Sequence, residues 1–249
     1  MHDLPPLRMP GATLMTRLNV YGTTAPDGQI SGTPHVHLAC SEMYVALSGR
    51  GAVELLDKDG FSRVELAAHD ALLFSPGTIH RLINPDGDFE ILVIMQNSGL
   101  PERGDNVVTF TDEWLANDER YAEAMTVKTL EDAYRRRDRG VEGFMQLKVA
   151  FEESQEAGRA ALEQFYECAA ARTAVKQNQW GEMIRSGALA AAEETLEHLE
   201  QLKQHDVGYL SQNAYTVIRQ SNANKLGFCG HLDRYFDPAT LMLEGKVTA

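Results

Sequence analysis

Three histidines and one glutamate in the first third of the chain have the types and the spacing of a metal site. His35 and His37 flank a single residue, Glu42 follows shortly after, and His80 lies further along the chain. In a β-strand, residues i and i+2 point to the same face, so His35 and His37 can both face one centre. A neighbouring strand could bring Glu42 to the same interior, and His80 would complete the site. Three imidazoles and one carboxylate suit Fe, Mn, Ni, Cu, Co or Zn, and leave one or two positions for substrate or dioxygen.

An alternative interpretation is that these residues are unrelated: a chance His-x-His pair, a surface glutamate and a histidine in a turn. The surrounding spacing disfavours that alternative. The segments His35-x-His37-x4-Glu42-x6-Gly49 and Pro76-Gly77-x2-His80-x3-Asn84 resemble the paired signature motifs of the cupin superfamily. The resemblance covers about residues 28–97, and it departs from the family pattern at turn positions: Gln29, His69-Asp70 and Ser75-Pro76-Gly77.

The resemblance implies a fold, a cofactor and an assembly. The fold is a cupin-type antiparallel β-barrel, or double-stranded β-helix, and the metal ligands are His35, His37, Glu42 and His80. The cofactor is one divalent transition metal: Fe, Mn, Ni, Cu or Zn. Because cupin barrels commonly dimerise, the resemblance also implies a homodimer.

The first part of the chain has the texture of a barrel. Residues 1–110 are punctuated by glycine and proline, with short β-branched or aromatic runs between them. Many short strands separated by turn residues are typical of a β-sandwich or barrel. The pattern predicts strands over 35–39, 42–48, 52–56, 62–66, 71–74, 79–83 and 89–96.

The second part of the chain is predicted to be helical. From Thr111 onwards the sequence is rich in Ala, Glu, Leu, Gln and Arg, which favour helices. The pattern predicts helices near 112–124, 129–151, 157–185, 187–205 and 207–221. We therefore expect a mainly β plus α chain with a barrel domain over 1–110 and an α-helical C-terminal domain or extension over 111–249, joined by a linker or strap between Asn97 and Thr111. The periodicity leaves open whether the helices fold alone or wrap the barrel.

Four other residues have positions that bear on the site. Tyr44 shares strand parity with Glu42, so it could contact a substrate or pack in the core. Gln96 ends the last apolar strand and could contact a substrate or lie at the rim. Arg81 follows His80 and should point out of the barrel, as a surface or interface residue. Cys40 is interpreted as a small buried residue.

Near the C-terminus, Cys229-Gly230-His231 is the remaining cluster of metal-binding residue types. It could fold over the mouth of the barrel. Because a Cys-x-His pair alone is a poor metal motif, a packed C-terminal loop is the favoured interpretation.

Composition narrows the class of protein. The chain carries 23 basic and 36 acidic side chains, a net charge of −13 that is shared between both parts, and its longest basic run is Arg135-Arg136-Arg137. Nucleic-acid binding is therefore not expected. No apolar run approaches the roughly 18 residues of a membrane span, and the first residues do not resemble a signal peptide. Three widely spaced cysteines suggest no disulfide framework, so we expect a cytoplasmic protein with no membrane partner.

The function implied by the resemblance is that of a metal-dependent cupin enzyme acting on a small molecule. The three-His, one-Glu set is similar to that of cupin oxygenases of the quercetin and acireductone types, which implies a dioxygenase-type oxidoreductase with Glu42 as a catalytic base as well as a ligand. One alternative is an isomerase or lyase acting on a sugar-like or hydroxy-carbonyl substrate. Another is a non-enzymatic, metal-stabilised binding or sensing protein.

Overall fold

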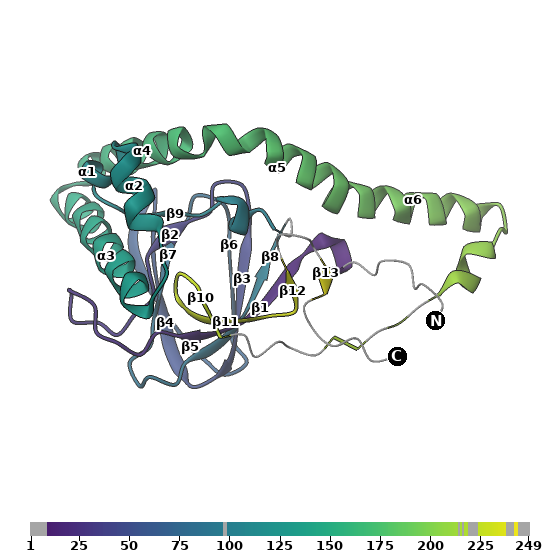
Figure 1. Cartoon of the computed structure of the whole chain (residues 1–249), viewed down its shortest axis with the longest axis horizontal. Coiled ribbons are helices and arrows are strands. Elements are labelled where there is room, and N and C mark those ends of the chain that lie inside the picture. The colour runs from purple at the N-terminus through teal and green to yellow at the C-terminus, as the bar shows by residue number, and fades with distance from the viewer. Residues whose placement is uncertain are drawn as a thin grey trace.

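The computed structural model describes residues 9–96, 99–213, 215, 217–218, 224–237 and 242–243. Two antiparallel sheets face one another, and helices lie against one side of them (Figure 1). The first sheet has the strand order β10-β11-β1-β8-β3-β6, and the second has the order β5-β4-β7-β2-β9. Most strands therefore pair with neighbours that are distant in sequence, which brings residues from many segments into one interior.

The bounds of the strands are as follows. The first sheet contains β10 (Lys225–Leu226), β11 (Gly230–Arg234), β1 (Leu14–Val20), β8 (Glu90–Met95), β3 (Glu42–Ser48) and β6 (Ala71–Phe74). The second contains β5 (Gly60–Ala67), β4 (Arg50–Asp57), β7 (Ile79–Ile83), β2 (His35–Val36) and β9 (Val107–Val108). A separate pair is formed by β12 (Phe236–Asp237) and β13 (Met242–Leu243).

All seven predicted strands are present, with one clear difference in length. The strand predicted over 35–39 is only two residues long, because the backbone amides of Leu38 and Ala39 donate to the Asp105 carboxylate and not to a neighbouring strand. The sequence analysis did not predict β1, although its alternate residues are buried in the regular pattern of a half-buried strand.

The helical part begins with α1 (Asp112–Leu115) and α2 (Asp118–Met125), continues with α3 (Leu130–Glu153) and α4 (Gln155–Thr173), and ends with α5 (Gln177–Ile184) and α6 (Ala190–Lys203). Short helical turns are η1 (Pro10–Ala12), η2 (Pro101–Arg103), η3 (Ala174–Lys176), the π-helical η4 (Arg185–Leu189) and η5 (Gly208–Gln212). Figure 1 shows α4, α5 and α6 running along the barrel, with α6 extending beyond it.

Three of the predicted helices differ from the structure. The helix predicted over 157–185 is divided into α4 and α5 by the short turn η3. The helix predicted over 112–124 is two helices, since the Asn117 side chain accepts from the Arg120 amide and starts a new one. The helix predicted over 207–221 is wrong within the described residues, where only the short turn η5 forms and Asn213 is already extended. Gly208 and the β-branched Val207, Val217 and Ile218 disfavour a helix there.

Helix α3 is held unusually close to the second sheet. A Cβ added to Gly143 would lie 2.1 Å from the Thr109 carbonyl oxygen, and one added to Gly140 would lie 2.7 Å from a methyl group of Val108. The Thr109 hydroxyl donates to the Gly140 carbonyl oxygen over 2.8 Å. These two glycines let the helix backbone contact β9, so residues one turn earlier on α3 reach the end of the barrel.

Residues after 111 also contribute to the barrel itself. Strand β11 pairs with β1 over five residues, from Thr16↔Arg234 to Val20↔Gly230. The division into a domain over residues 1–110 and a second over 111–249 remains a proposal. Strand β11, from the second part of the chain, belongs to the first sheet. Within the described residues, we find no helix with the length and hydrophobicity that a membrane span requires.

Candidate metal centre

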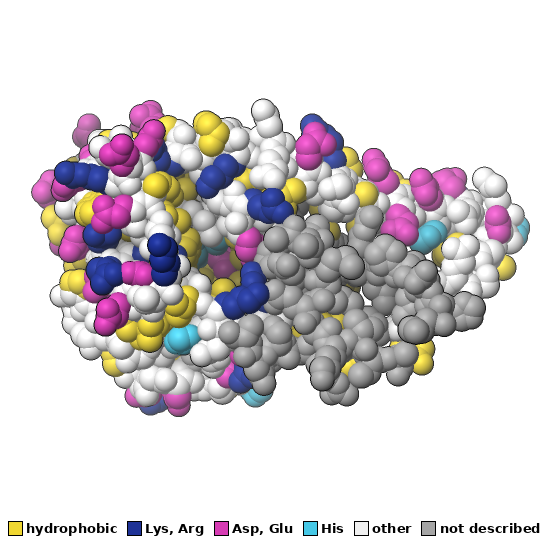
Figure 2. Space-filling view, viewed as in Figure 1, with side chains coloured by type: hydrophobic (Ala, Val, Ile, Leu, Met, Phe, Trp, Pro, Cys, Tyr) yellow, Lys and Arg dark blue, Asp and Glu magenta, His cyan; other side chains and the backbone are white. Residues whose placement is uncertain are grey.

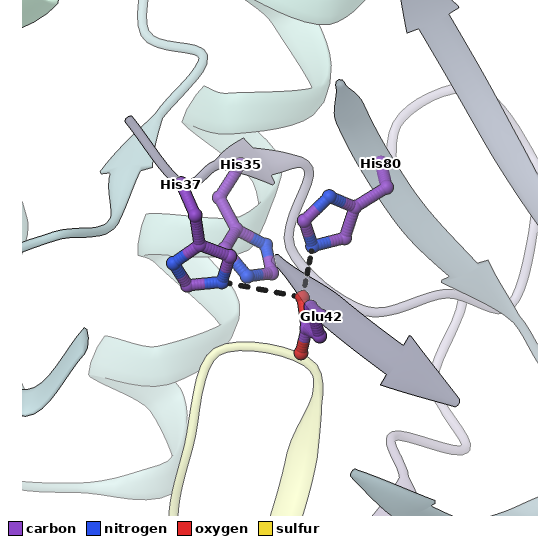
Figure 3. Close-up of side chains that lie close together, drawn as sticks. All are labelled: His35, His37, Glu42 and His80. Carbon is purple, nitrogen blue, oxygen red and sulfur yellow. Dashed lines mark ion pairs between the residues drawn. The ribbon is translucent and has the colours of Figure 1, made fainter. Parts of the chain in front are cut away.

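The four residues singled out from the sequence converge on one point inside the barrel (Figure 3). His35 lies on β2, His37 follows it, Glu42 begins β3 and His80 lies on β7, directly opposite His35. One potential ligand atom from each residue lies within 4.8 Å of all the others, and all four residues are buried. The arrangement can hold a cation with three nitrogen donors and one oxygen donor.

Backbone carbonyl groups fix the orientation of all three imidazoles. The Nδ1–H of His35 donates to the Thr33 carbonyl oxygen over 2.9 Å, and that of His80 donates to the Thr78 carbonyl oxygen over 2.9 Å. His37 makes the corresponding bond to the carbonyl oxygen of Asp105. Since a carbonyl only accepts, the proton is assigned to Nδ1, and each Nε2 is left with a lone pair for a metal.

Asp105 supports the site with its side chain as well as its backbone. One carboxylate oxygen, Oδ1, accepts from the amide of Leu38 over 2.7 Å and from that of Ala39 over 2.9 Å. The residue is fully buried. Asp105 therefore holds the His37 ring through its backbone and the two residues that follow His37 through its side chain. Asp105 was not among the predicted site residues, because it lies in the expected linker, where no periodic pattern marks it.

Mutual electrostatics shift the pKa values of Glu42, His35 and His37. Although burial opposes ionisation, His37 and His80 hold the pKa of Glu42 well below its ordinary value. Burial and the neighbouring His80 and His37 lower the pKa of His35. Against the effect of burial, the Glu42 carboxylate raises the pKa of His37. Glu42 is thus an anion that a cation in the centre would stabilise.

Two buried polar atoms in the centre have no hydrogen-bond partner: Oε2 of Glu42 and Nε2 of His80. The same Oε2 lies 3.1 Å from His80 Nε2 and 3.3 Å from His37 Nε2, as the dashed lines in Figure 3 show. A buried polar group without a partner costs about 1–3 kcal/mol. A divalent transition metal would satisfy both atoms, so the residues present fit the expected cofactor.

The centre opens into a cavity of about 250 Å³. In Figure 2 this face is hollowed between the helices and the strands, and histidine and acidic side chains are visible inside the hollow. Beyond the metal site, the cavity walls are mostly apolar side chains from the first sheet and the adjoining loops, with a smaller number of polar or charged side chains. The apolar residues include Leu14, Leu18, Val93, Met95, Phe228 and Leu232, and the polar ones include Glu102, Asn106, Arg136 and Arg234.

The two residues predicted to contact substrate lie in different places. Tyr44 lines the cavity and is also buried in the core, with its ring 5.1 Å from that of Phe74 and 5.9 Å from that of His80. Burial and the Glu42 carboxylate raise the pKa of Tyr44 well above its ordinary value. Gln96 is exposed and lies outside the cavity lining, and its side chain accepts from the Ser41 amide.

Arg81 was expected at the surface, and this expectation is wrong. It is only 1% exposed, because α3 covers the outer face of the second sheet and places Phe144 against the guanidinium. Asp27 and Glu54 pair with it there. Cys40 is buried, as expected.

The segment around Cys229 lies over the mouth of the barrel. The favoured interpretation, a packed C-terminal loop, is wrong for Gly230 and His231, which belong to strand β11. Phe228 and Cys229 line the cavity, and the Cys229 sulfur lies 3.9 Å from Nδ1 of His35. The backbone pairing of β11 with β1 brings it there. Burial raises the pKa of the Cys229 thiol to about 12, so it is a neutral wall of the cavity.

Comparison with known families agrees with the motifs. A family model described as a cupin domain matches residues 23–95. The predicted fold class, a cupin-type antiparallel barrel followed by a helical region, is confirmed.

The chain is also similar to solved structures. One is a TDP-fucose-3,4-ketoisomerase from Campylobacter jejuni, with 16% identity, a TM-score of 0.28, and coverage of 33% of this chain and 58% of that one. Another is a conserved double-stranded β-helix protein from Klebsiella pneumoniae, with 15% identity, a TM-score of 0.29, and coverage of 39% and 79%. A third is oxalate decarboxylase from Bacillus subtilis, with 19% identity, a TM-score of 0.25, and coverage of 26% and 17%. No curated protein matches the chain.

Proposed function

We propose that this cupin is a metal-dependent enzyme acting on a small molecule, and that His35, His37, Glu42 and His80 hold one divalent transition metal. The observation that carries the proposal is the set of three imidazoles whose Nδ1 atoms are bonded to backbone carbonyls and whose Nε2 atoms face a buried carboxylate. An open cavity adjoins them, as a catalytic site requires and a purely structural site does not.

The reaction we propose is of the dioxygenase type. A metal bound there would supply Lewis-acid and redox chemistry to a substrate with an enol or diol group. Glu42 would take the proton of that group, because a carboxylate is the most easily released of the four ligands. Tyr44, kept protonated by burial, would donate a hydrogen bond to a substrate oxygen. The apolar walls would keep water away from the activated substrate.

A metal-dependent isomerase or lyase is the second candidate, and one observation favours it. Glu102 lines the cavity and is a second carboxylate, besides the ligand Glu42, that could move a proton between carbon atoms. In that reaction the metal would polarise a carbonyl group, and dioxygen would not be consumed.

Oxygen uptake separates the two reactions. The metal-loaded protein would be incubated with a panel of small enols and α-hydroxy ketones, in air with an oxygen electrode, and without oxygen in D₂O with NMR detection of exchanged protons. We expect oxygen uptake that His80→Ala abolishes. Anaerobic proton exchange without oxygen uptake, lost in Glu102→Gln, would replace the dioxygenase with the isomerase. Neither signal from metal-loaded protein would indicate a binding or sensing role.

We also propose a cytoplasmic homodimer. The three cysteines are free thiols, as a reducing compartment requires. Leu196, Leu199 and Leu202 on α6 are between 45% and 60% exposed at helical spacing, which is the pattern of an interface.

A further inference from the structure

The three consecutive arginines of α3 have different surroundings. Arg135 is exposed and pairs with Asp132. Arg137 is buried, but it donates to the carbonyl oxygens of Thr23 and Thr24 and pairs with Asp138. Arg136 is also buried, with only 5% exposed, and it lines the metal cavity. A structural role accounts for Arg135 and Arg137, and it leaves the charge of Arg136 unexplained.

Arg136 is short of partners for its charge. Its Nη2 donates to the Gly227 carbonyl oxygen over 2.6 Å, and its buried Nε–H has no hydrogen-bond acceptor. Among the residues that the structure describes, no carboxylate lies within ion-pair distance of this guanidinium. By contrast, the buried Arg81 pairs with Asp27 and Glu54. A buried cation without a counter-ion destabilises a fold, so its presence beside a cavity points to a missing anion.

The groups nearest to Arg136 do not supply that negative charge. Its electrostatic neighbours are Tyr21 and Cys229. The Tyr21 hydroxyl donates to the Gly227 carbonyl oxygen over 2.9 Å, and the Cys229 thiol donates to the Thr33 carbonyl oxygen over 3.4 Å, so both groups keep their protons and are neutral. Burial lowers the pKa of Arg136 to about 10, which leaves the guanidinium protonated. Arg234 adds a second cation to the same cavity wall.

The position of Arg136 suits a substrate that also reaches the metal site. Its guanidinium carbon lies 4.3 Å from the centre of the Phe228 ring, and that ring centre lies 5.1 Å from the centre of the His35 ring. One aromatic ring thus separates the cation from a metal-site histidine. The cavity of about 250 Å³ is smaller than the roughly 300–1,000 Å³ of pockets for drug-sized ligands. It can take a small molecule that spans from Arg136 to the four ligands.

We propose that Arg136 binds a carboxylate group of the substrate, so that the substrate of this cupin is a small carboxylic acid whose other end reaches the metal. The inference rests on the proposed function for the metal end of the site. A guanidinium offers two parallel N–H groups to a carboxylate, and the free Nε–H of Arg136 is one such donor. In the sequence, this arginine stands out only as part of a basic run too short for nucleic-acid binding.

The competing explanation is that Arg136 only holds the β10–β11 hairpin in place through Gly227 and Phe228. The two roles differ in what a neutral replacement does. Arg136→Met fills the same space without a charge. If the arginine serves a substrate, this variant keeps or raises the melting temperature and loses carboxylate binding. If the arginine is only structural, the variant lowers the melting temperature and leaves carboxylate binding unchanged in folded protein.

The test is calorimetric titration of the full chain with malonate, succinate and glutarate, with succinamide as the neutral control. Metal-free and metal-loaded samples would be compared, and the metal content of each would be measured. We expect at least one dicarboxylate, and not succinamide, to bind the wild type and the exposed-site control Arg135→Gln equally. Arg136→Met should weaken that binding at least about 10-fold. If Arg136→Met fails to fold, Arg136→Lys, which keeps the charge but not the planar fork, should weaken it severalfold.

Two results would overturn the proposal: no binding of any of the three dicarboxylates by wild type, or equal binding by wild type and folded Arg136 variants. The metal measurement separates this failure from failure of the proposed function. If the wild type holds no metal, the proposed function fails, and the metal-free titration still tests Arg136 alone. If the wild type holds metal but Arg136 variants bind like wild type, only the carboxylate inference fails.

Discussion

Asp105 connects the fold to the metal site, so replacing it should lower both the stability of the protein and its affinity for the metal. In Asp105→Ala, the amides of Leu38 and Ala39 lose the acceptor that they share at 2.7 and 2.9 Å. A hydrogen bond to a charged group contributes about 1.5–3 kcal/mol, so losing two should lower the free energy of unfolding by about 3–5 kcal/mol. Urea unfolding of the metal-free protein, followed by circular dichroism, measures this loss without any contribution from a bound ion.

Asp105→Asn is the matched control. The oxygen that accepts both amides is Oδ1, while Oδ2 has no hydrogen-bond partner. An asparagine can keep the accepting oxygen and place its amide nitrogen where Oδ2 lies, so it should cost less than half as much as alanine. Metal affinity should follow the same order, with a loss of about 10–100-fold in Asp105→Ala, because the chain that follows His37 loses the acceptor of its two amides and no longer holds the ligand in place. Equal stability of Asp105→Ala and wild type, or equal effects of the two substitutions, would refute this reasoning.

Three further predictions concern the helices and the cavity wall. Gly143→Ala should lower the free energy of unfolding by about 1–3 kcal/mol in urea, because its Cβ would lie 2.1 Å from a carbonyl oxygen of the second sheet. Gly181→Ala on α5 is the control: its Cβ would meet nothing closer than 3.4 Å, so it should leave the free energy of unfolding unchanged or raise it by up to about 1 kcal/mol. A larger loss of stability in Gly181→Ala than in Gly143→Ala would contradict the close packing of α3 on the sheet. Iodoacetamide at pH 8 should label the partly exposed Cys168 well before Cys229, because burial raises the pKa of the Cys229 thiol to about 12 and its thiolate is therefore scarce. Peptide mass spectrometry measures the labelling of each cysteine, and early labelling of Cys229 would contradict this prediction. Light scattering should give twice the chain mass of 27.6 kDa, and Leu199→Glu should give the monomer; a monomeric wild type would exclude the proposed dimer.

The sequence was informative where local patterns decide the structure. Alternation placed His35 and His37 on one face, and the turn residues around Gly49 and Gly77 marked the ends of strands that the structure contains. Both of these glycines have positive φ angles of 73° and 87°, which favour glycine over other residues. Alternation also placed Arg81 on the face opposite His80, but it could not predict that a helix covers that face.

The remaining parts of the site come from distant segments, which local patterns do not place. His37 and Asp105 are 68 residues apart, Arg136 and Gly227 are 91 apart, and His35 and Cys229 are 194 apart. Each of these contacts depends on strand order, since β9, α3 and β11 meet β2 and β1 only in the folded chain. A periodicity identifies a strand or helix without giving its neighbours. The sequence therefore predicted the four candidate ligands and missed the residues that orient and enclose them.

Metal content tests the central claim most directly. The wild type would be purified without added metal or chelator and analysed by inductively coupled plasma mass spectrometry, beside His80→Ala and His198→Ala. His198 lies on α6 and stacks on Tyr209, outside the cluster of four residues, so it controls for the loss of any histidine. We expect one transition-metal ion per chain in the wild type and His198→Ala, and strongly reduced metal in His80→Ala. No metal in the wild type even after reconstitution, or equal metal in His80→Ala, would contradict it.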